Sequence, residues 1–157
     1  MKLGNLSSWE QADADTLNYY MQYYSTWLGQ PADLLMLVAM KESSYNPDTG
    51  IFNNTYSWTG AAGLMQLRPI ALRDIRQRFG IAIDPMEPVQ AIVGAALMFY
   101  LNRIYLRHYT RQNPDINALI VAYNSGWQMG LRYMNGQSIA RESVQYLASI
   151  GGALGTA

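Results

Sequence analysis

A single glutamate at the end of an apolar run is the residue best placed for acid–base chemistry. Glu42 follows the run LLMLVAM and a lysine, and counting back from it by three, four and seven positions reaches only apolar residues: Ala39, Val38 and Leu35. On a helix these positions share one face. Partial burial and the negative end of the helix dipole both disfavour an ionised carboxylate, so we expect a raised pKa for Glu42. A carboxyl group still protonated near neutral pH can act as a general acid; the alternative is a helix-end glutamate that bends into water.

Three further motifs carry polar groups that could line a binding cleft. Gly63, in GAAGLMQLRP, would let the backbone approach a ligand, and Gln66 places an amide inside an apolar run, where it needs hydrogen-bond partners. AYNSG puts Tyr123 and Asn124 at a helix end, and RESVQYL offers Tyr146. Each also has a plain structural interpretation, as a core-edge tyrosine or a helix cap, and spacing alone does not show that they converge.

The elements that must position these residues are predicted to be helices. Pro69 and Pro88 suit first helical turns, Gly80 and Gly126 suit helix ends, and Asp115 is a suitable N-cap. We expect helices over about residues 8–28, 31–44, 69–79, 88–109, 116–125, 127–134 and 138–149.

The remaining segments set the domain organisation. Residues 47–63 are rich in turn formers and predict a loop or a small β-hairpin between the second and third helices. The fold class is therefore mainly α, with six to eight helices. The length suits a single domain over residues 1–157, whose last residues, 151–157, read as a flexible tail.

Composition excludes several classes of function. The chain has 157 residues, 11 basic and 11 acidic side chains and zero formal net charge, so a nucleic-acid partner is not expected. There is no cysteine, which removes disulfides, thiol nucleophiles and cysteine metal sites, and the one histidine, His108, suits a surface or helix-end position. No stretch of 18 apolar residues is present, so no stable membrane insertion is expected, and the N-terminus MKLGNLSSWEQ lacks the apolar segment of a signal peptide.

Four motifs in order carry a family resemblance: ESSYNP, GAAGLMQLRP, AYNSG and ESVQYL. Together they resemble the signatures of lytic transglycosylases of the soluble-lytic-transglycosylase (SLT) type, over roughly residues 30–150. The resemblance implies an α+β, goose-type-lysozyme-like fold whose helices surround a glycan cleft. The chain departs from the pattern at three positions, with Ser125 for Ala, Ser143 for Thr and Leu147 for Val.

The resemblance also implies an activity and a set of site residues. Lytic transglycosylases cleave the β-1,4 bond between N-acetylmuramic acid and N-acetylglucosamine in peptidoglycan and leave 1,6-anhydro-muramyl ends. Glu42 aligns with the single catalytic acid/base, and Tyr146 with the tyrosine that hydrogen-bonds it. The substrate-binding positions implied by the motifs are Ser43, Gly63, Met65, Gln66, Tyr123 and Asn124. No metal or cofactor is used.

A shortage of second carboxylates agrees with chemistry based on one acid. Glu10, Glu87 and Glu142 sit in polar or early-helix positions and read as surface residues, which leaves Asp48 as the nearest alternative. Most glycosidases need a second carboxylate at about 5–9.5 Å from the first. A muramidase-type hydrolase on the same fold, or a non-catalytic glycan-binding module, remains the alternative.

The stretch between Glu42 and Gln66 is several residues longer than is usual in the family. It carries Tyr56 and Trp58, which are candidate subsite aromatics for stacking on sugar faces, or else members of a small hydrophobic cluster.

Peptidoglycan lies outside the cytoplasmic membrane, so the enzyme would act in the bacterial cell wall or periplasm. With no signal peptide in view, we expect a protein that is carried by a phage virion, injected by a secretion machine, or part of a larger protein.

Overall fold

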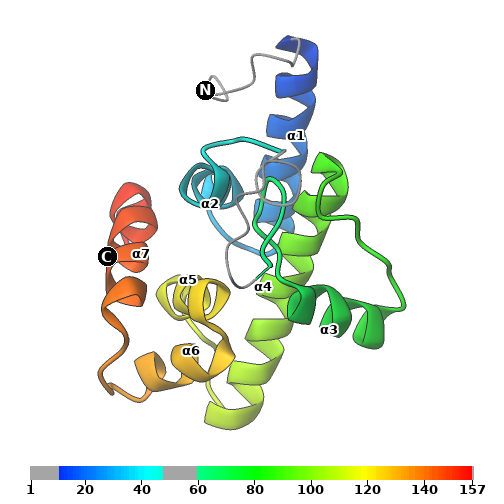
Figure 1. The fold of residues 1–157 in the computed structure, drawn as a ribbon. Helices are drawn as coiled ribbons and strands as arrows, with labels where there is room; N and C mark the ends of the chain where they lie inside the picture. The colour runs from blue at the N-terminus through cyan, green and yellow to red at the C-terminus, as the bar shows by residue number, and fades with distance from the viewer. Residues whose placement is uncertain (1–10, 48–59, 157) are drawn as a thin grey trace. The chain divides into compact units, whose positions relative to one another are not determined.

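The computed structural model describes residues 11–47 and 60–156, with only the backbone described for residues 11–13. The described residues are mainly α-helical, as predicted, and form seven helices (Figure 1). Their bounds are α1 Gln11–Trp27, α2 Leu34–Ser43, α3 Pro69–Phe79, α4 Pro88–Thr110, α5 Ile116–Ser125, α6 Trp127–Met134 and α7 Arg141–Leu154. The chain divides into two compact units, residues 1–97 and 98–157, and α4 crosses from one to the other.

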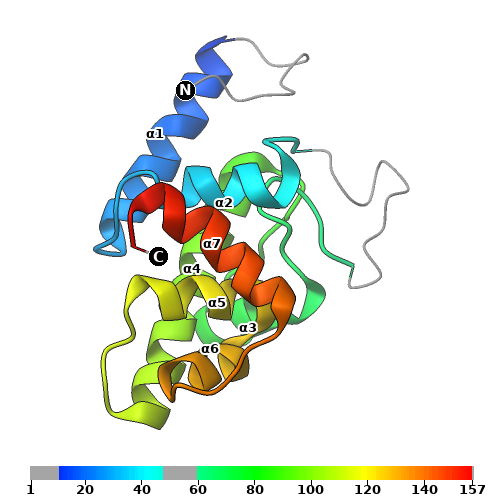
Figure 2. The same cartoon turned by 90° about the vertical axis from the view of Figure 1, so that its left-hand side faces the viewer.

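In the first unit, α1 packs against α2 (Figures 1 and 2). The buried hydroxyl of Ser25 connects the two helices, because its Oγ donates to the Met21 carbonyl at 2.7 Å and accepts from the Leu35 amide at 3.1 Å. The predicted start of the second helix at residue 31 is wrong. Residues 31–33 form a turn in which the Leu34 amide donates to the Pro31 carbonyl at 3.0 Å. The helix begins at Leu34.

The third helix has the predicted bounds. Pro69 occupies its first turn, where a missing N–H costs nothing, and Gly80 ends it in the left-handed region at φ 69°. The Gly80 amide donates to the Arg76 carbonyl at 2.9 Å.

The segment between α2 and α3 is described at residues 44–47 and again from residue 60, so the predicted β-hairpin falls mostly outside the described residues. Within residues 60–68 the chain makes one isolated antiparallel bridge, between Ala62 and Leu67, closed by two backbone hydrogen bonds of 3.1 Å. This turn packs closely on α4, since a Cβ added at Gly94 would come within 2.7 Å of the Leu67 Cδ1 atom.

In the second unit, α5 packs against both α6 and α7. Residues 118–122 of α5 are all buried. Asp115 caps the helix as predicted, because its carboxylate accepts from the Ala118 amide at 2.8 Å. Gly130 of α6 allows close packing, since a Cβ there would lie 2.9 Å from that of Ala122.

The last helix starts and ends later than predicted. It runs from Arg141 to Leu154, so residues 151–154, assigned to a flexible tail from the sequence, are helical. Beyond the Gly155 cap, the Asn117 Nδ2 atom donates to the Thr156 carbonyl at 2.8 Å, and the Thr156 hydroxyl donates to the Asn117 Oδ1 atom at 3.0 Å. These two bonds attach the end of α7 to the first turn of α5.

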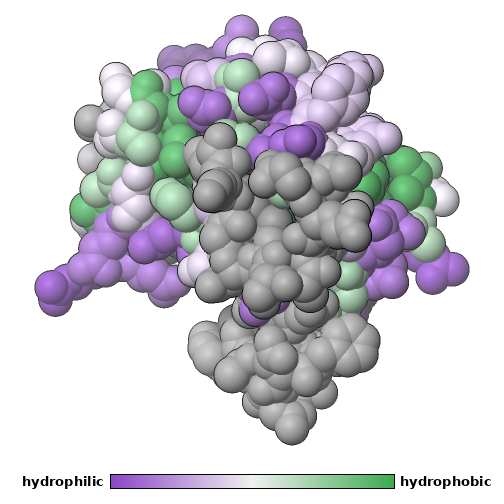
Figure 3. Space-filling model, turned by 90° about the horizontal axis from the view of Figure 1, so that it is seen from above, coloured by the Kyte–Doolittle hydropathy of each residue, from purple (hydrophilic) through white to green (hydrophobic). Residues whose placement is uncertain are grey.

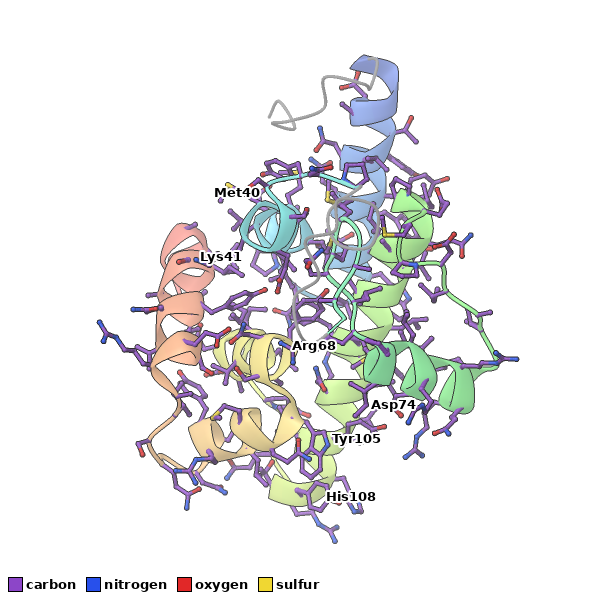
Figure 4. The ribbon with its side chains drawn as sticks, in the orientation of Figure 1. Met40, Lys41, Arg68, Asp74, Tyr105 and His108 are labelled. Carbon is purple, nitrogen blue, oxygen red and sulfur yellow. The ribbon has the colours of Figure 1, made fainter. Side chains whose placement is uncertain are left out.

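Helix α4 is long and apolar enough, by length and composition, to cross a membrane. Half of the qualifying window is buried inside the protein, including the side chains of Ile92, Phe99 and Leu106. We therefore interpret α4 as a core helix. Its last turn carries His108, which is exposed, as expected from the sequence (Figure 4).

Aromatic side chains contact one another in each unit, within one helix in the first and between two helices in the second. On α1 the Tyr24 and Trp27 rings meet edge to face, with centroids 6.2 Å apart. In the second unit the Tyr109 ring of α4 stacks on Trp127 of α6 at 4.8 Å. Seen from above, the described residues present hydrophobic side chains in separate groups among hydrophilic ones (Figure 3).

Candidate functional site

Glu42 occupies the penultimate position of α2. The six residues that open this helix, 34–39, are all buried, whereas Met40 and Lys41 are exposed (Figure 4). Glu42 itself is half-buried, so the helical face count is confirmed: the lysine points to water and the glutamate lies at the border of the core. The helix ends one residue later, at Ser43.

Two consecutive non-glycine residues with positive φ end this helix. Ser44 has φ 52° and Tyr45 has φ 61°. Their amides donate to the Met40 and Ala39 carbonyls at 3.0 and 3.3 Å, which satisfies the last turn of the helix. Left-handed backbone costs of order 1–3 kcal/mol at a non-glycine residue, and such strain clusters at functional sites. The strain here lies directly after the Glu-Ser pair.

Tyr45 is a residue of this region that the sequence did not single out. Its side chain is 5% exposed. Burial raises the pKa of the Tyr45 phenol, and the negative charge of Asp33 raises it further. Helical periodicity could not have predicted the burial of Tyr45, because the helix ends before this residue. The one signal in the sequence is its position directly before Asn-Pro.

Ser43 connects Glu42's helix to the GAAGLMQLRP turn. Its hydroxyl is buried and lies 2.7 Å from the Leu64 carbonyl, to which it donates, and 3.1 Å from the carbonyl of Ala39. The structure therefore gives Ser43 a role in holding two segments together. The substrate-binding role implied by the resemblance stays a prediction.

The GAAGLMQLRP turn is fixed by contacts with its own unit. Gly63 has φ 78°, and a Cβ added there would collide with the Pro85 carbonyl oxygen, so its close approach is to protein backbone. Gln66 also has positive φ, at 49°, and its side-chain Nε2 donates to the Gly63 carbonyl at 2.9 Å. Gln66 is half-buried, whereas the side chain of Met65 is fully buried in the core.

The AYNSG and ESVQYL motifs meet in the second unit. The Tyr123 ring is half-buried and stacks on Phe99 at 4.8 Å, with the ring planes 11° apart. Asn124 and Tyr146 are buried. Two hydrogen bonds connect helices α5 and α7 here. One joins the hydroxyl of Ser125 to the side chain of Asn124, and the other joins that hydroxyl to the hydroxyl of Ser143.

The predicted residues thus form two groups. Glu42, Ser43, Gly63, Met65 and Gln66 belong to the first unit, and Tyr123, Asn124 and Tyr146 to the second. That these groups converge on one cleft stays a prediction. Tyr56, Trp58, Asp48 and Glu10 lie outside the described residues.

Several other carboxylates in the described residues have structural tasks. Asp74 pairs with Arg78 of the same helix at 3.7 Å, and Asp84 accepts from the Met86 amide at 2.9 Å (Figure 4). Glu87 accepts from the amides of the first turn of α4, at 3.3 and 2.7 Å. Glu142 is exposed, as expected. Glu42 differs from all of these in standing at the end of a buried helix.

The comparison with known families covers the first three motifs in full and the first three residues of the fourth, and it ends before Tyr146. The family model of the transglycosylase SLT domain matches residues 19–144, which is most of the chain and includes Glu42, Gln66 and Asn124. The chain therefore belongs to the transglycosylase SLT domain family. Membership makes it a lytic transglycosylase at the level of the family, with peptidoglycan as the substrate class. A search of the curated proteins finds no match.

Proposed function

We propose that this protein cleaves the β-1,4 bond between N-acetylmuramic acid and N-acetylglucosamine and releases 1,6-anhydro-muramyl ends. The observation that carries the proposal is the match over residues 19–144, within which Glu42 stands half-buried at the end of a buried helix. The helix set also agrees with a goose-type-lysozyme-like fold, which we propose for the complete chain as one domain.

Glu42 is proposed to act first as the acid and then as the base. Its carboxyl proton passes to the glycosidic oxygen as the bond from that oxygen to muramyl C1 breaks. The acetamido oxygen of the substrate supports the positive charge at C1. The Glu42 carboxylate then removes the proton of the muramyl 6-hydroxyl, whose oxygen bonds to C1, so the sugar closes on itself and no water is consumed.

The other motif residues have supporting roles in this proposal. The resemblance assigns Tyr146 to hydrogen-bonding the glutamate and assigns Gln66, Tyr123 and Asn124 to holding the sugar and its acetamido group. Tyr56 and Trp58 extend the binding surface by stacking on further sugar rings.

Mass spectrometry of the products released from purified sacculi tests the proposal. The expected products end in anhydro-muramyl groups, one water lighter than reducing ends. Glu42→Gln should abolish release, while Glu142→Gln, a matched change at an exposed glutamate, should leave it unchanged. Reducing ends would instead identify a muramidase-type hydrolase. Unaltered release by Glu42→Gln would refute the role of that residue, and binding without any release would favour a glycan-binding module.

We also propose that the protein acts in the cell wall or periplasm and is delivered there by a virion or a secretion machine. The location of the substrate supports this. Immunodetection of the chain in purified particles tests it, and a chain found only in the producing cell's cytoplasm would contradict it.

A further inference from the structure

An exposed row of aromatic side chains runs along α1. Tyr19, Tyr23 and Trp27 are spaced four residues apart, so they share one side of the helix. Their side chains are 63%, 51% and 50% exposed, while Leu17 and Met21 of the same helix are buried in the core. Large aromatic side chains gathered on one exposed face indicate a surface that binds something. We call these three residues the aromatic row.

Two inner tyrosines hold the aromatic row in place. Tyr20 and Tyr24 are half-buried. The Tyr20 ring meets that of Tyr19 edge to face at 5.6 Å, and the Tyr24 ring meets those of Tyr23 and Trp27 at 5.1 and 6.2 Å. Within the row, the rings of Tyr19 and Tyr23 lie 6.3 Å apart with their planes 25° from parallel. Rings held in this way lose less conformational freedom when a ligand binds, so the row is preorganised.

The surroundings of the aromatic row are polar and uncharged. Gln22 and Thr26 are exposed beside the rings, residues 16–32 contain no charged side chain, and every aliphatic side chain within residues 14–28 is buried. Membrane-binding helices instead use basic residues for anionic lipids and aliphatic side chains for the acyl region. A sugar chain presents C–H groups on its ring faces and hydroxyl groups at its edges. Aromatic rings flanked by neutral hydrogen-bonding groups match that chemistry.

We propose that the aromatic row is an accessory binding surface for the glycan strand of peptidoglycan, in addition to the candidate site at Glu42. For the class of ligand the inference rests on the proposed function, but it rests on no step of the reaction. The row spans eight residues of helix, or about 12 Å, so more than one sugar ring can lie along it. The row keeps the enzyme on an insoluble polymer between successive cleavages.

Binding to peptide-free glycan tests the proposal without catalysis. The probe is glycan strands from which an amidase has removed the stem peptides, immobilised and titrated with the full chain carrying Glu42→Gln. Adding Tyr19→Ala and Tyr23→Ala together should weaken binding about tenfold, because two stacking faces are lost. Tyr19→Phe with Tyr23→Phe keeps both rings and should weaken binding less than about threefold.

A matched control tests whether the position of the tyrosines matters. Tyr109 is 57% exposed and also contacts a neighbouring ring, but it belongs to the second unit. Tyr109→Ala should therefore leave the affinity for glycan strands unchanged. Unfolding midpoints confirm that each variant is folded, as expected for the replacement of exposed rings.

Kinetics with Glu42 intact give an independent measurement. The double alanine variant should need a concentration of sacculi about tenfold higher for half-maximal release, and should keep the maximal rate, because only binding outside the candidate site is weakened. A lower maximal rate with unchanged half-saturation would contradict an accessory role.

The remaining outcomes separate this inference from its rivals and from the proposed function. Unchanged glycan binding by the double alanine variant, an equal loss in Tyr109→Ala, or no binding of peptide-free strands by the Glu42→Gln chain itself would overturn it. So would a row needed for binding phosphatidylcholine vesicles, or for a dimer seen in sedimentation equilibrium, but not for glycan. Absence of anhydro products from the unaltered protein would overturn the reaction proposed above, yet the glycan affinities would still decide the role of the row.

Discussion

Three consecutive side chains at the end of α2 have three different environments. Lys41 is exposed, Glu42 is half-buried and Ser43 is buried. Each step along a helix turns the side chain by about 100°, so adjacent residues at the border of a core can have different environments. The same helical rotation that leaves the Lys41 side chain exposed places the Ser43 hydroxyl within hydrogen-bonding distance of the Leu64 carbonyl. The placement of Glu42 therefore depends on its neighbours as much as on its own chemistry.

Tyr45 should make the stability of the protein depend on pH in the alkaline range. Its pKa is raised by burial and by Asp33, above the ordinary value of about 10. The folded state then holds the phenolic proton more tightly than the unfolded state, so the contribution to stability is complete below pH ~10 and is lost as the pH rises through the folded pKa. We expect the advantage of the unaltered protein over Tyr45→Phe in urea unfolding to shrink above pH ~10. A difference that stays constant across that range would contradict the shift.

Gly63 should tolerate no side chain. Gly63→Ala places a Cβ against the Pro85 carbonyl in addition to the strain of φ 78°, so we expect a loss of more than about 3 kcal/mol in the free energy of unfolding. Gly80→Ala is the matched control, because Gly80 has φ 69° and nothing within 4 Å of an added Cβ. It should lose about 1–2 kcal/mol. Equal losses in urea unfolding would show that the close approach to Pro85 does not matter.

Helix bounds could be predicted where the deciding groups are local. Pro69 and Gly80 fix both ends of α3, and Asp115 fixes the start of α5, within a few residues of the helix itself. The start of α2 and the end of α7 were missed. Bonds to partners distant in sequence accompany both, from the Leu35 amide to Ser25 in one case and between Asn117 and Thr156 in the other, and no local pattern contains these bonds.

In the candidate site, too, features set by local sequence could be predicted and features set by distant or irregular segments could not. Glu42 could be found from periodicity because the helix that carries it is regular. Tyr45 and the Ser125–Ser143 contact could not, since one depends on irregular backbone and the other joins residues 18 positions apart. Motif likeness located the positions, but not the partners that orient them.

The N-cap of α5 should contribute measurably to stability. Asp115→Ala removes the acceptor of the Ala118 amide, at an expected cost of about 1 kcal/mol and a fall in Tm of about 2–4 °C. Asp115→Asn keeps an acceptor at that position and should retain most of the stability. Thermal unfolding followed by circular dichroism measures both, and equal melting of the alanine variant and the unaltered protein would refute the cap.

The longest helix is shared by both units, which constrains how the molecule can meet a membrane. Helix α4 could enter a bilayer only by exposing Ile92, Phe99 and Leu106, which are buried within the protein. We expect the folded protein to remain at the bottom of a liposome flotation gradient at neutral pH. Recovery in the floating fraction, with α-helical content unchanged, would overturn the assignment of α4 to the core.

Each unit also carries its own optical probe. Trp27 lies beside Tyr24 in the first unit, and Trp127 lies against Tyr109 in the second. Replacing all tryptophans but one with phenylalanine leaves a fluorophore whose emission, and whose energy transfer from the adjacent tyrosine, reports on one unit alone. If two such variants have coincident melting curves, the two units unfold together even though the boundary between them falls inside α4. Separate curves would show that one half can loosen while the other stays folded.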